Sequence, residues 1–102
     1  MENKLKYASI YTARAQKDLV DSFTWYEQQK KGLGDRFIGA VKHKIEKIEQ
    51  NPESFAIKYQ SYREASVSAF PYVIIYRINN RKKTIRIFSV FHTAQNTKNK
   101  YK

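Results

Sequence analysis

Three short apolar runs decide the fold: YREASVSAF (residues 62–70), PYVIIYRI (71–78) and TIRIFSVFH (84–92). They are too short for helices and rich in β-branched and aromatic residues, which favours strands. The run Tyr72–Tyr76 is continuously apolar or aromatic, as is typical of a central strand buried on both faces. Asn79-Asn80 tolerates left-handed backbone and predicts a hairpin between the last two strands.

Two helical patterns precede these strands. We expect Thr12 to be the N-cap of a helix that begins at Ala13. Residues three or four apart form one stripe along this helix: Ala15, Leu19, Phe23, Tyr26 and Lys30. Val20 and Trp25 are expected to widen the apolar part of the stripe. Gly32 ends this helix, because glycine adopts the left-handed conformation without steric cost. A second helix follows until Asn51-Pro52, with a stripe of Leu33, Phe37, Val41, Ile45 and Ile48.

The remaining segments complete a β-α-α-β-β-β order. Residues 4–11 alternate loosely and predict a first strand. Residues 53–60 form a connection, in which Phe55 and Tyr59 are expected to cover the core. The polar, basic tail 93–102 is expected to fray. We therefore predict an α+β fold in a single domain, 1–102: a small antiparallel sheet packed on one face by a helical hairpin.

Composition limits the classes of function. The 102 residues carry 41% hydrophobic and 15% aromatic residues, enough for one folded core. The absence of cysteine fits a reducing cytoplasm, and no apolar run has the length of a signal peptide or membrane span. Twenty Lys and Arg against nine Asp and Glu give a net charge of +11. Such a charge predicts a polyanionic partner, whether nucleic acid, an acidic protein segment or an anionic membrane surface.

Basic side chains fall in or beside the predicted strands: Arg63, Arg77, Arg81 and Arg86. Arginine stabilises a pentavalent phosphate in RNA cleavage, and a histidine supplies a proton acceptor or donor. Arg63, Arg86 and His92 are therefore candidate ribonuclease residues, with Glu64 the nearest strand carboxylate. Strand alternation places Arg86 and His92 on the same face. The alternative is that these arginines are the solvated positions of a half-buried sheet.

No metal or cofactor site is predicted. His43 lies among lysines on the polar side of the second helix, and the two histidines lack the spacing of metal ligands. The eight tyrosines interleaved with basic residues are similar to a single-strand binding platform. Positions such as Tyr7, Tyr72 and Tyr76 are better explained by core packing.

The sequence resembles the RelE/ParE superfamily of bacterial toxin–antitoxin toxins over nearly its whole length. The matching segments are Ala15-x-x-Asp18-Leu19, Trp25-Tyr26, Gly32-Leu33-Gly34-x-x-Phe37, Ile45-x-x-Ile48, Asn51-Pro52-x-x-Phe55, Tyr62–Ala65, Phe70–Tyr76 and Ile87–His92. The resemblance implies the same β-α-α-β-β-β fold. It also implies one of two activities, cleavage of ribosome-bound mRNA in the RelE-like branch or poisoning of DNA gyrase in the ParE-like branch.

Several positions favour the ParE-like branch. Ribonuclease members usually have an arginine directly after the tyrosine that opens the central strand, and here Val73 follows Tyr72. Ala65 and Thr93 stand where further basic groups would be expected. The Phe-Pro-Tyr opening and the Val-x-His ending resemble ParE-like proteins more closely, although Gln95 replaces an arginine often found there.

The resemblance implies a toxin neutralised by a cognate antitoxin, whose acidic amphipathic segment binds the toxin in a hetero-oligomer. The expected antitoxin contacts are Trp25, Tyr26, Phe37 and Tyr62, and the expected target contacts are Arg63, Arg77, Arg86 and His92. DNA gyrase is the expected target, and the protein would then not be a hydrolytic enzyme. The alternatives are a ribosome-dependent mRNA endonuclease, a decayed toxin with no active target, and a plain RNA-binding domain.

Overall fold

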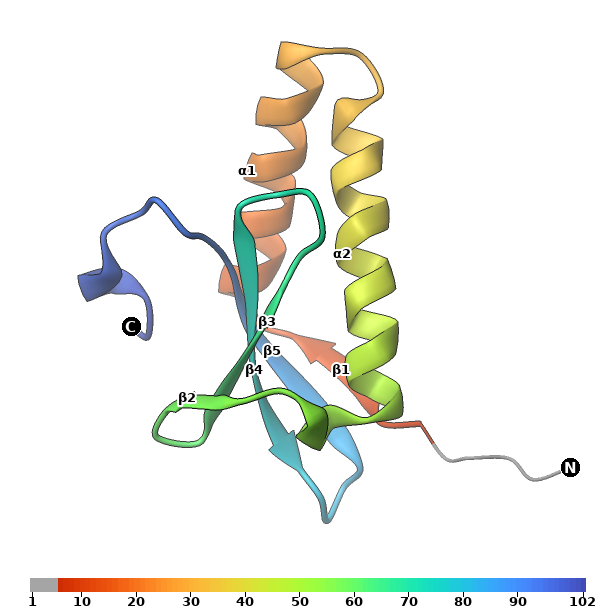
Figure 1. Ribbon diagram of the computed structural model, residues 1–102, viewed down its shortest axis with the longest axis vertical. Coiled ribbons are helices and arrows are strands. Elements are labelled where there is room, and N and C mark those ends of the chain that lie inside the picture. Colours follow the sequence, from red (N-terminus) through yellow and green to blue (C-terminus); the bar gives the residue numbers. More distant parts are fainter. Residues whose placement is uncertain (1–5) are drawn as a thin grey trace, which may run out of the picture.

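The computed structural model describes residues 6–102 (Figure 1). Its elements in chain order are β1 (Ala8–Tyr11), α1 (Ala13–Gln29), α2 (Leu33–Gln50), the 3-10 turn η1 (Pro52–Ser54), β2 (Ile57–Tyr59), β3 (Tyr62–Ser66), β4 (Tyr72–Asn79), β5 (Thr84–His92) and the 3-10 turn η2 (Thr97–Asn99). The predicted α+β class and the helical hairpin are confirmed. Part of the predicted first strand, residues 4 and 5, lies outside the described residues.

The sheet has the order β1-β5-β4-β3-β2 and is mixed. We predicted an antiparallel sheet, and this is wrong for one pair, because β1 runs parallel to β5. After β1 the chain continues into the α1–α2 hairpin, and the last strand, β5, later lies beside β1 and runs in the same direction. The segment predicted as a plain connection also contains β2, a three-residue edge strand paired with β3.

The core lies between the α1–α2 hairpin and one face of the sheet, called here the helix face. β4 turns Tyr72, Ile74 and Tyr76 toward the helices, and all three are at most 7% exposed. α2 presents a buried stripe as predicted, except that its first turn buries Gly34 in place of Leu33; the stripe is Phe37, Val41, Ile45 and Ile48. Each of these side chains removes apolar surface from water, which is the dominant stabilising term.

The two helices are joined by a turn that a carboxylate stabilises. Gly32 has a φ of 89°, a left-handed conformation that favours glycine. The Glu27 carboxylate accepts hydrogen bonds from the backbone N–H groups of Gly32 (2.8 Å) and Gly34 (2.9 Å). Two N–H groups at the start of α2 are therefore satisfied by a side chain of α1, which joins the two helices at their turn.

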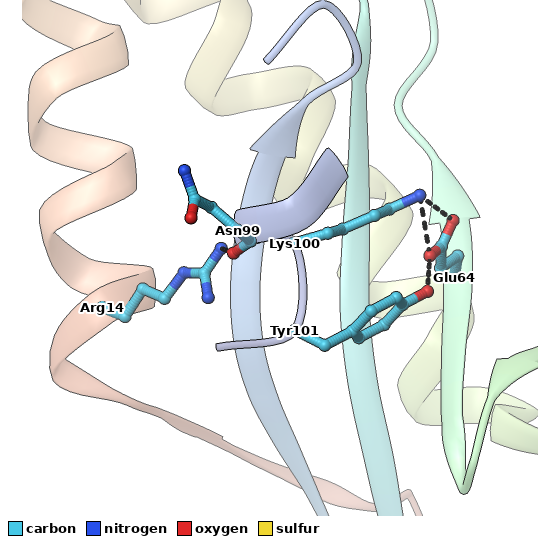
Figure 2. Close-up of polar contacts among 5 residues, drawn as sticks. All are labelled: Arg14, Glu64, Asn99, Lys100 and Tyr101. Carbon is cyan, nitrogen blue, oxygen red and sulfur yellow. Dashed lines mark hydrogen bonds and ion pairs between the residues drawn. The ribbon is translucent and has the colours of Figure 1, made fainter. Parts of the chain in front are cut away.

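The other face of the sheet, called here the open face, is partly covered by the chain's own C-terminal segment. Ile75 and Phe91 face away from the helices but are only 0% and 3% exposed. Figure 2 shows the side chain of Lys100 crossing the strands to reach Glu64 of β3, with an Nζ–Oε2 distance of 3.0 Å. The Tyr101 hydroxyl donates to the same carboxylate.

Further contacts hold this segment to the neighbouring elements. The Arg14 guanidinium of α1 donates to the backbone carbonyls of Asn99 (2.9 Å) and Lys102 (3.0 Å), and the Tyr101 ring stacks on Tyr59 at 4.5 Å. The structure therefore differs from the frayed tail that we predicted. Polar composition does not reveal a carboxylate on β3 that pairs with the segment's own lysine and tyrosine.

A buried tyrosine makes the stability of the fold sensitive to alkali. The Tyr76 hydroxyl donates to the Pro52 carbonyl at 2.6 Å, and burial raises its pKa from 10.0 to about 12. Because the folded-state pKa lies above the unfolded-state value, stability is fully present below pH 10 and is lost as pH rises toward 12. Burial also raises the pKa of Tyr11 and of Tyr26, which adds to this loss with the same sign.

We therefore expect Tyr76→Phe to reduce the loss of stability above pH 10. At neutral pH this variant should be destabilised by about 1–3 kcal/mol, because the buried Pro52 carbonyl loses its donor. Urea unfolding of both proteins at pH 7, 10 and about 11 measures the two effects. Equal slopes of stability against pH in the two proteins would contradict the role given to Tyr76.

Candidate functional site

An aromatic hollow of about 350 Å³ lies between the start of the tail and α1; its lining is Trp25, Tyr26, Tyr72, His92, Ala94 and Gln95. The His92 ring meets Tyr72 edge-on at a centroid distance of 4.9 Å. Its Nδ1 accepts a hydrogen bond from the Ala94 backbone N–H at 3.0 Å. In the neutral ring the proton is therefore on Nε2, which is left as a donor. This surface, called here the aromatic pocket, brings two predicted antitoxin contacts, Trp25 and Tyr26, beside one predicted target contact, His92.

A chain of packed rings, which ends in the core, supports the aromatic pocket. Trp25 is 55% exposed and meets Tyr26 edge-on at 5.1 Å. Tyr26 packs on Phe37 at 5.3 Å, and Phe37 packs on Tyr72 at 4.8 Å. Phe37, predicted among the antitoxin contacts, is 0% exposed and so is covered by its neighbours in this structure. It lies in the core because the α2 stripe faces the sheet, and it acts by holding the rings above it. Val20 and Trp25, expected to widen the core stripe of α1, are both more than half exposed.

A β-bulge separates two of the predicted ribonuclease residues. Across β4 and β5, Ile75 pairs with Ser89 but Tyr76 pairs with Ile87, which leaves Phe88 as an extra residue. The bulge shifts the alternation of side chains by one position. Arg86 therefore pairs with Arg77 on the open face, whereas His92 pairs with Tyr72 on the helix face. The prediction that Arg86 and His92 share a face is wrong, since uninterrupted alternation does not hold through the bulge.

Arg63 binds backbone within the fold. Its Nη1 donates to the carbonyl oxygens of Phe55 (2.7 Å) and Glu53 (3.2 Å), and so holds the turn before β2. Arg63 pairs with Tyr76 of β4 on the helix face, whereas His92 pairs with Tyr72, four residues earlier in the same strand. At about 3.3 Å per residue this separation is roughly 13 Å. The structure thus does not bring Arg63, Arg86 and His92 together.

Arg77, Arg86 and Tyr62 lie on the open face. The Arg77 guanidinium carbon is 5.2 Å from the centroid of the Tyr62 ring, and Tyr62 also packs against Phe88 and Tyr101. Tyr62 is therefore on the face opposite the aromatic pocket and is partly covered by the C-terminal segment. It does not form one surface with Trp25 and Tyr26, so the predicted antitoxin contacts are divided between the two faces of the sheet.

Two sets of polar contacts in this region were missed in the sequence. The Asp18 carboxylate of α1 accepts from the Ser89 hydroxyl (2.7 Å) and from the Val90 backbone N–H (3.0 Å), and Ala94 orients His92 through its backbone. Backbone groups carry no signal in residue type, so only coordinates reveal these contacts.

His43 is exposed, as predicted. Within residues 6–102 no group of three or more His, Asp or Glu could hold a metal ion, and no helix of this part is long and apolar enough to cross a membrane.

Comparison with known proteins places this arrangement in a family. A family described as the ParE toxin of the type II toxin–antitoxin system parDE matches residues 10–97. No match was found among curated proteins. Since the family match covers most of the sequence, the chain belongs to the ParE toxin family of type II toxin–antitoxin systems.

Solved structures of toxin–antitoxin complexes share the fold. A chain of the chromosomal ParDE system from P. aeruginosa aligns with a TM-score of 0.73 at 14% identity, over 88% of this chain and 98% of that chain. A chain of the RelBE2 complex from Mycobacterium tuberculosis gives 0.65 at 20% identity, over 93% and 100%. A chain of the intact E. coli RelBE complex gives 0.66 at 16% identity, over 87% and 99%.

Proposed function

We propose that this ParE-family toxin inhibits DNA gyrase in the cytoplasm without cutting RNA, and that a cognate antitoxin neutralises it. The observation that carries the proposal is the separation of the three candidate ribonuclease residues. Arg63 is bonded to backbone carbonyls, Arg86 faces the open side, and His92 faces the aromatic pocket. General acid–base cleavage requires groups within hydrogen-bond reach of one phosphate. The valine after Tyr72 supports the same choice.

The aromatic pocket supports a role in protein binding. Trp25 is exposed and rests on Tyr26, which is partly buried and packs on the core ring of Phe37. A few residues carry most of the binding energy in protein interfaces, and Trp and Tyr are enriched among them. We propose that the antitoxin's acidic amphipathic segment places an apolar side chain in this pocket. The +11 charge of the toxin speeds the approach of an acidic partner.

Induction of the toxin without its antitoxin tests the proposed target in cells. A gyrase inhibitor should cause filamentation and DNA-damage signalling while incorporation of labelled amino acids continues. An endonuclease would stop protein synthesis first, and harmless expression would indicate a decayed toxin; either outcome contradicts the proposal. The double variant Arg63→Ala/His92→Ala tests the alternative activity. It should abolish RNA cleavage if these residues form a ribonuclease site, and intact cleavage in the variant would refute such a site.

A further inference from the structure

A second hollow, of about 490 Å³, lies on the open face beside the β4–β5 turn; its lining includes Ile10, Arg77, Asn79, Asn80, Lys82 and Arg86. Arg77 and Arg86 are direct partners across the two strands, and both are exposed. This hollow, called here the arginine hollow, lies on the opposite face of the sheet from the aromatic pocket.

The charges of the arginine hollow are unbalanced. Like charges directly opposite each other on a sheet are unfavourable. Within residues 6–102, no carboxylate forms an ion pair with Arg77, Lys82 or Arg86. Other carboxylates are engaged elsewhere, with partners on the helices, β1, β5 and the tail; they are Asp18, Asp21, Glu27, Glu49 and Glu64. A bound anion would relieve the repulsion between the two arginines.

The polar groups of the hollow are arranged as donors. The Asn80 Oδ1 accepts from the Tyr7 hydroxyl at 2.6 Å, and the Asn79 Oδ1 accepts from the Lys82 backbone N–H at 3.0 Å. Both amide oxygens are therefore used, which leaves their NH₂ groups as donors. With two guanidinium groups and an ammonium group, the hollow offers donors and positive charge to a ligand.

A cation–π contact helps to hold one arginine in place. The Arg77 guanidinium lies over the Tyr62 ring, which packs in turn against Phe88 at 5.0 Å and Tyr101 at 5.4 Å. A guanidinium held over an aromatic ring by a cation–π contact keeps N–H groups free to donate to oxygen acceptors. Tyr62 is thus a positioning residue for Arg77.

We propose that the arginine hollow binds phosphate groups of a nucleic-acid backbone. The planar fork of arginine matches phosphate geometry in two hydrogen bonds, and a body of +11 charge adds long-range attraction. The hollow lacks the aromatic anchors that a protein interface uses, since Ile10 is its one exposed large hydrophobic side chain among the described residues. This site goes beyond the proposed function, because it does not depend on gyrase or on the antitoxin.

The test is the salt dependence of binding to a short fluorescein-labelled DNA duplex of arbitrary sequence, followed by anisotropy between about 50 and 200 mM KCl. Arg77→Gln/Arg86→Gln should weaken binding at least about tenfold at the lower salt concentration. It should also reduce the slope of log K against log salt by roughly 1.8, which corresponds to two lost phosphate contacts. Tyr62→Phe should bind like the wild type, whereas Tyr62→Leu should weaken binding.

The matched control removes the same charge from the tip of the helical hairpin. Lys31→Gln/Arg36→Gln changes two exposed cations, one in the turn between α1 and α2 and one in the first turn of α2. This end of the helical hairpin lies opposite the β4–β5 turn (Figure 1). Its affinity should stay within about twofold of the wild type, with an unchanged slope. An equal loss in this control would mean that only net charge matters, and would overturn the proposal.

Two further measurements distinguish loss of the site from unfolding of the variant and from binding of an acidic protein. Removing the repulsion should leave the melting temperature of Arg77→Gln/Arg86→Gln unchanged or raised, so loss of binding would not reflect unfolding. Poly-glutamate replaces DNA in a parallel titration. The proposal would be overturned if Arg77→Gln/Arg86→Gln weakened the binding of poly-glutamate but left the affinity for DNA unchanged. That result would assign the hollow to an acidic protein. The assay contains no gyrase, so its outcome is separate from that of the proposed function.

Discussion

Replacing Phe37 with alanine should destabilise the fold by about 3–5 kcal/mol, the loss expected for a fully buried aromatic side chain. Its ring is surrounded by Tyr26, Phe70 and Tyr72 at centroid distances of 5.3, 5.3 and 4.8 Å. Truncation would leave a cavity between α2 and β4 that these rigid rings cannot fill. Since small domains have only about 5–15 kcal/mol of stability, much of the total would be lost.

Urea unfolding measures this loss of unfolding free energy, and two other variants serve as comparisons. Phe37→Leu retains most of the apolar volume and should be less destabilising. Val20→Ala truncates a side chain on α1 that is 63% exposed, and should change stability by less than about 0.5 kcal/mol. A loss below about 1 kcal/mol in Phe37→Ala would show that the rings do not form the packed core described above.

Trp25→Ala should weaken binding of the antitoxin by about 2 kcal/mol or more, which is roughly thirtyfold in dissociation constant. Trp25 is the most exposed ring of the aromatic pocket, and it rests edge-on against Tyr26. Because its side chain is 55% exposed, its removal should change the stability of the free toxin little. The effect on binding can therefore be separated from an effect on folding.

Val20→Ala is the matched control for this prediction, since it removes another exposed apolar side chain from the same helix outside the pocket. Titration calorimetry with the purified antitoxin should give wild-type affinity for Val20→Ala and reduced affinity for Trp25→Ala. Equal affinities for the two variants would place the antitoxin elsewhere on the toxin.

Local patterns were sufficient to predict most of the fold. The regular spacing from Phe37 to Ile48 predicts the buried face of α2, and the apolar run Tyr72–Tyr76 predicts the central strand. The parallel pairing of β1 with β5 was not predictable in this way. It joins residues more than seventy positions apart, such as Ala8 and Thr84, and a four-residue strand carries no signal for its direction.

The candidate site was less predictable than the fold, because its geometry depends on one extra residue. Phe88 shifts the alternation along β5, so Arg86 and His92 lie on opposite faces. Nothing in the letters TIRIFSVFH marks the bulge. The contacts of Glu64 with Lys100 and Tyr101 also join distant segments, and local polarity predicted the opposite behaviour for the tail.

The helix face and the open face therefore have different chemistry. The aromatic pocket offers rings and one histidine donor, as a protein partner requires. The arginine hollow offers positive charge and N–H donors, as a phosphate backbone requires. Their separation allows each to be changed by substitution without altering the other, which makes the two proposals independent in practice.

The most direct test of the proposed activity is DNA supercoiling by purified gyrase in the presence of the purified toxin. We predict that relaxed plasmid is no longer supercoiled, that added antitoxin restores the activity, and that ribosome-bound message stays intact at the same toxin concentration. Full gyrase activity together with cleavage of ribosome-bound message would contradict the account.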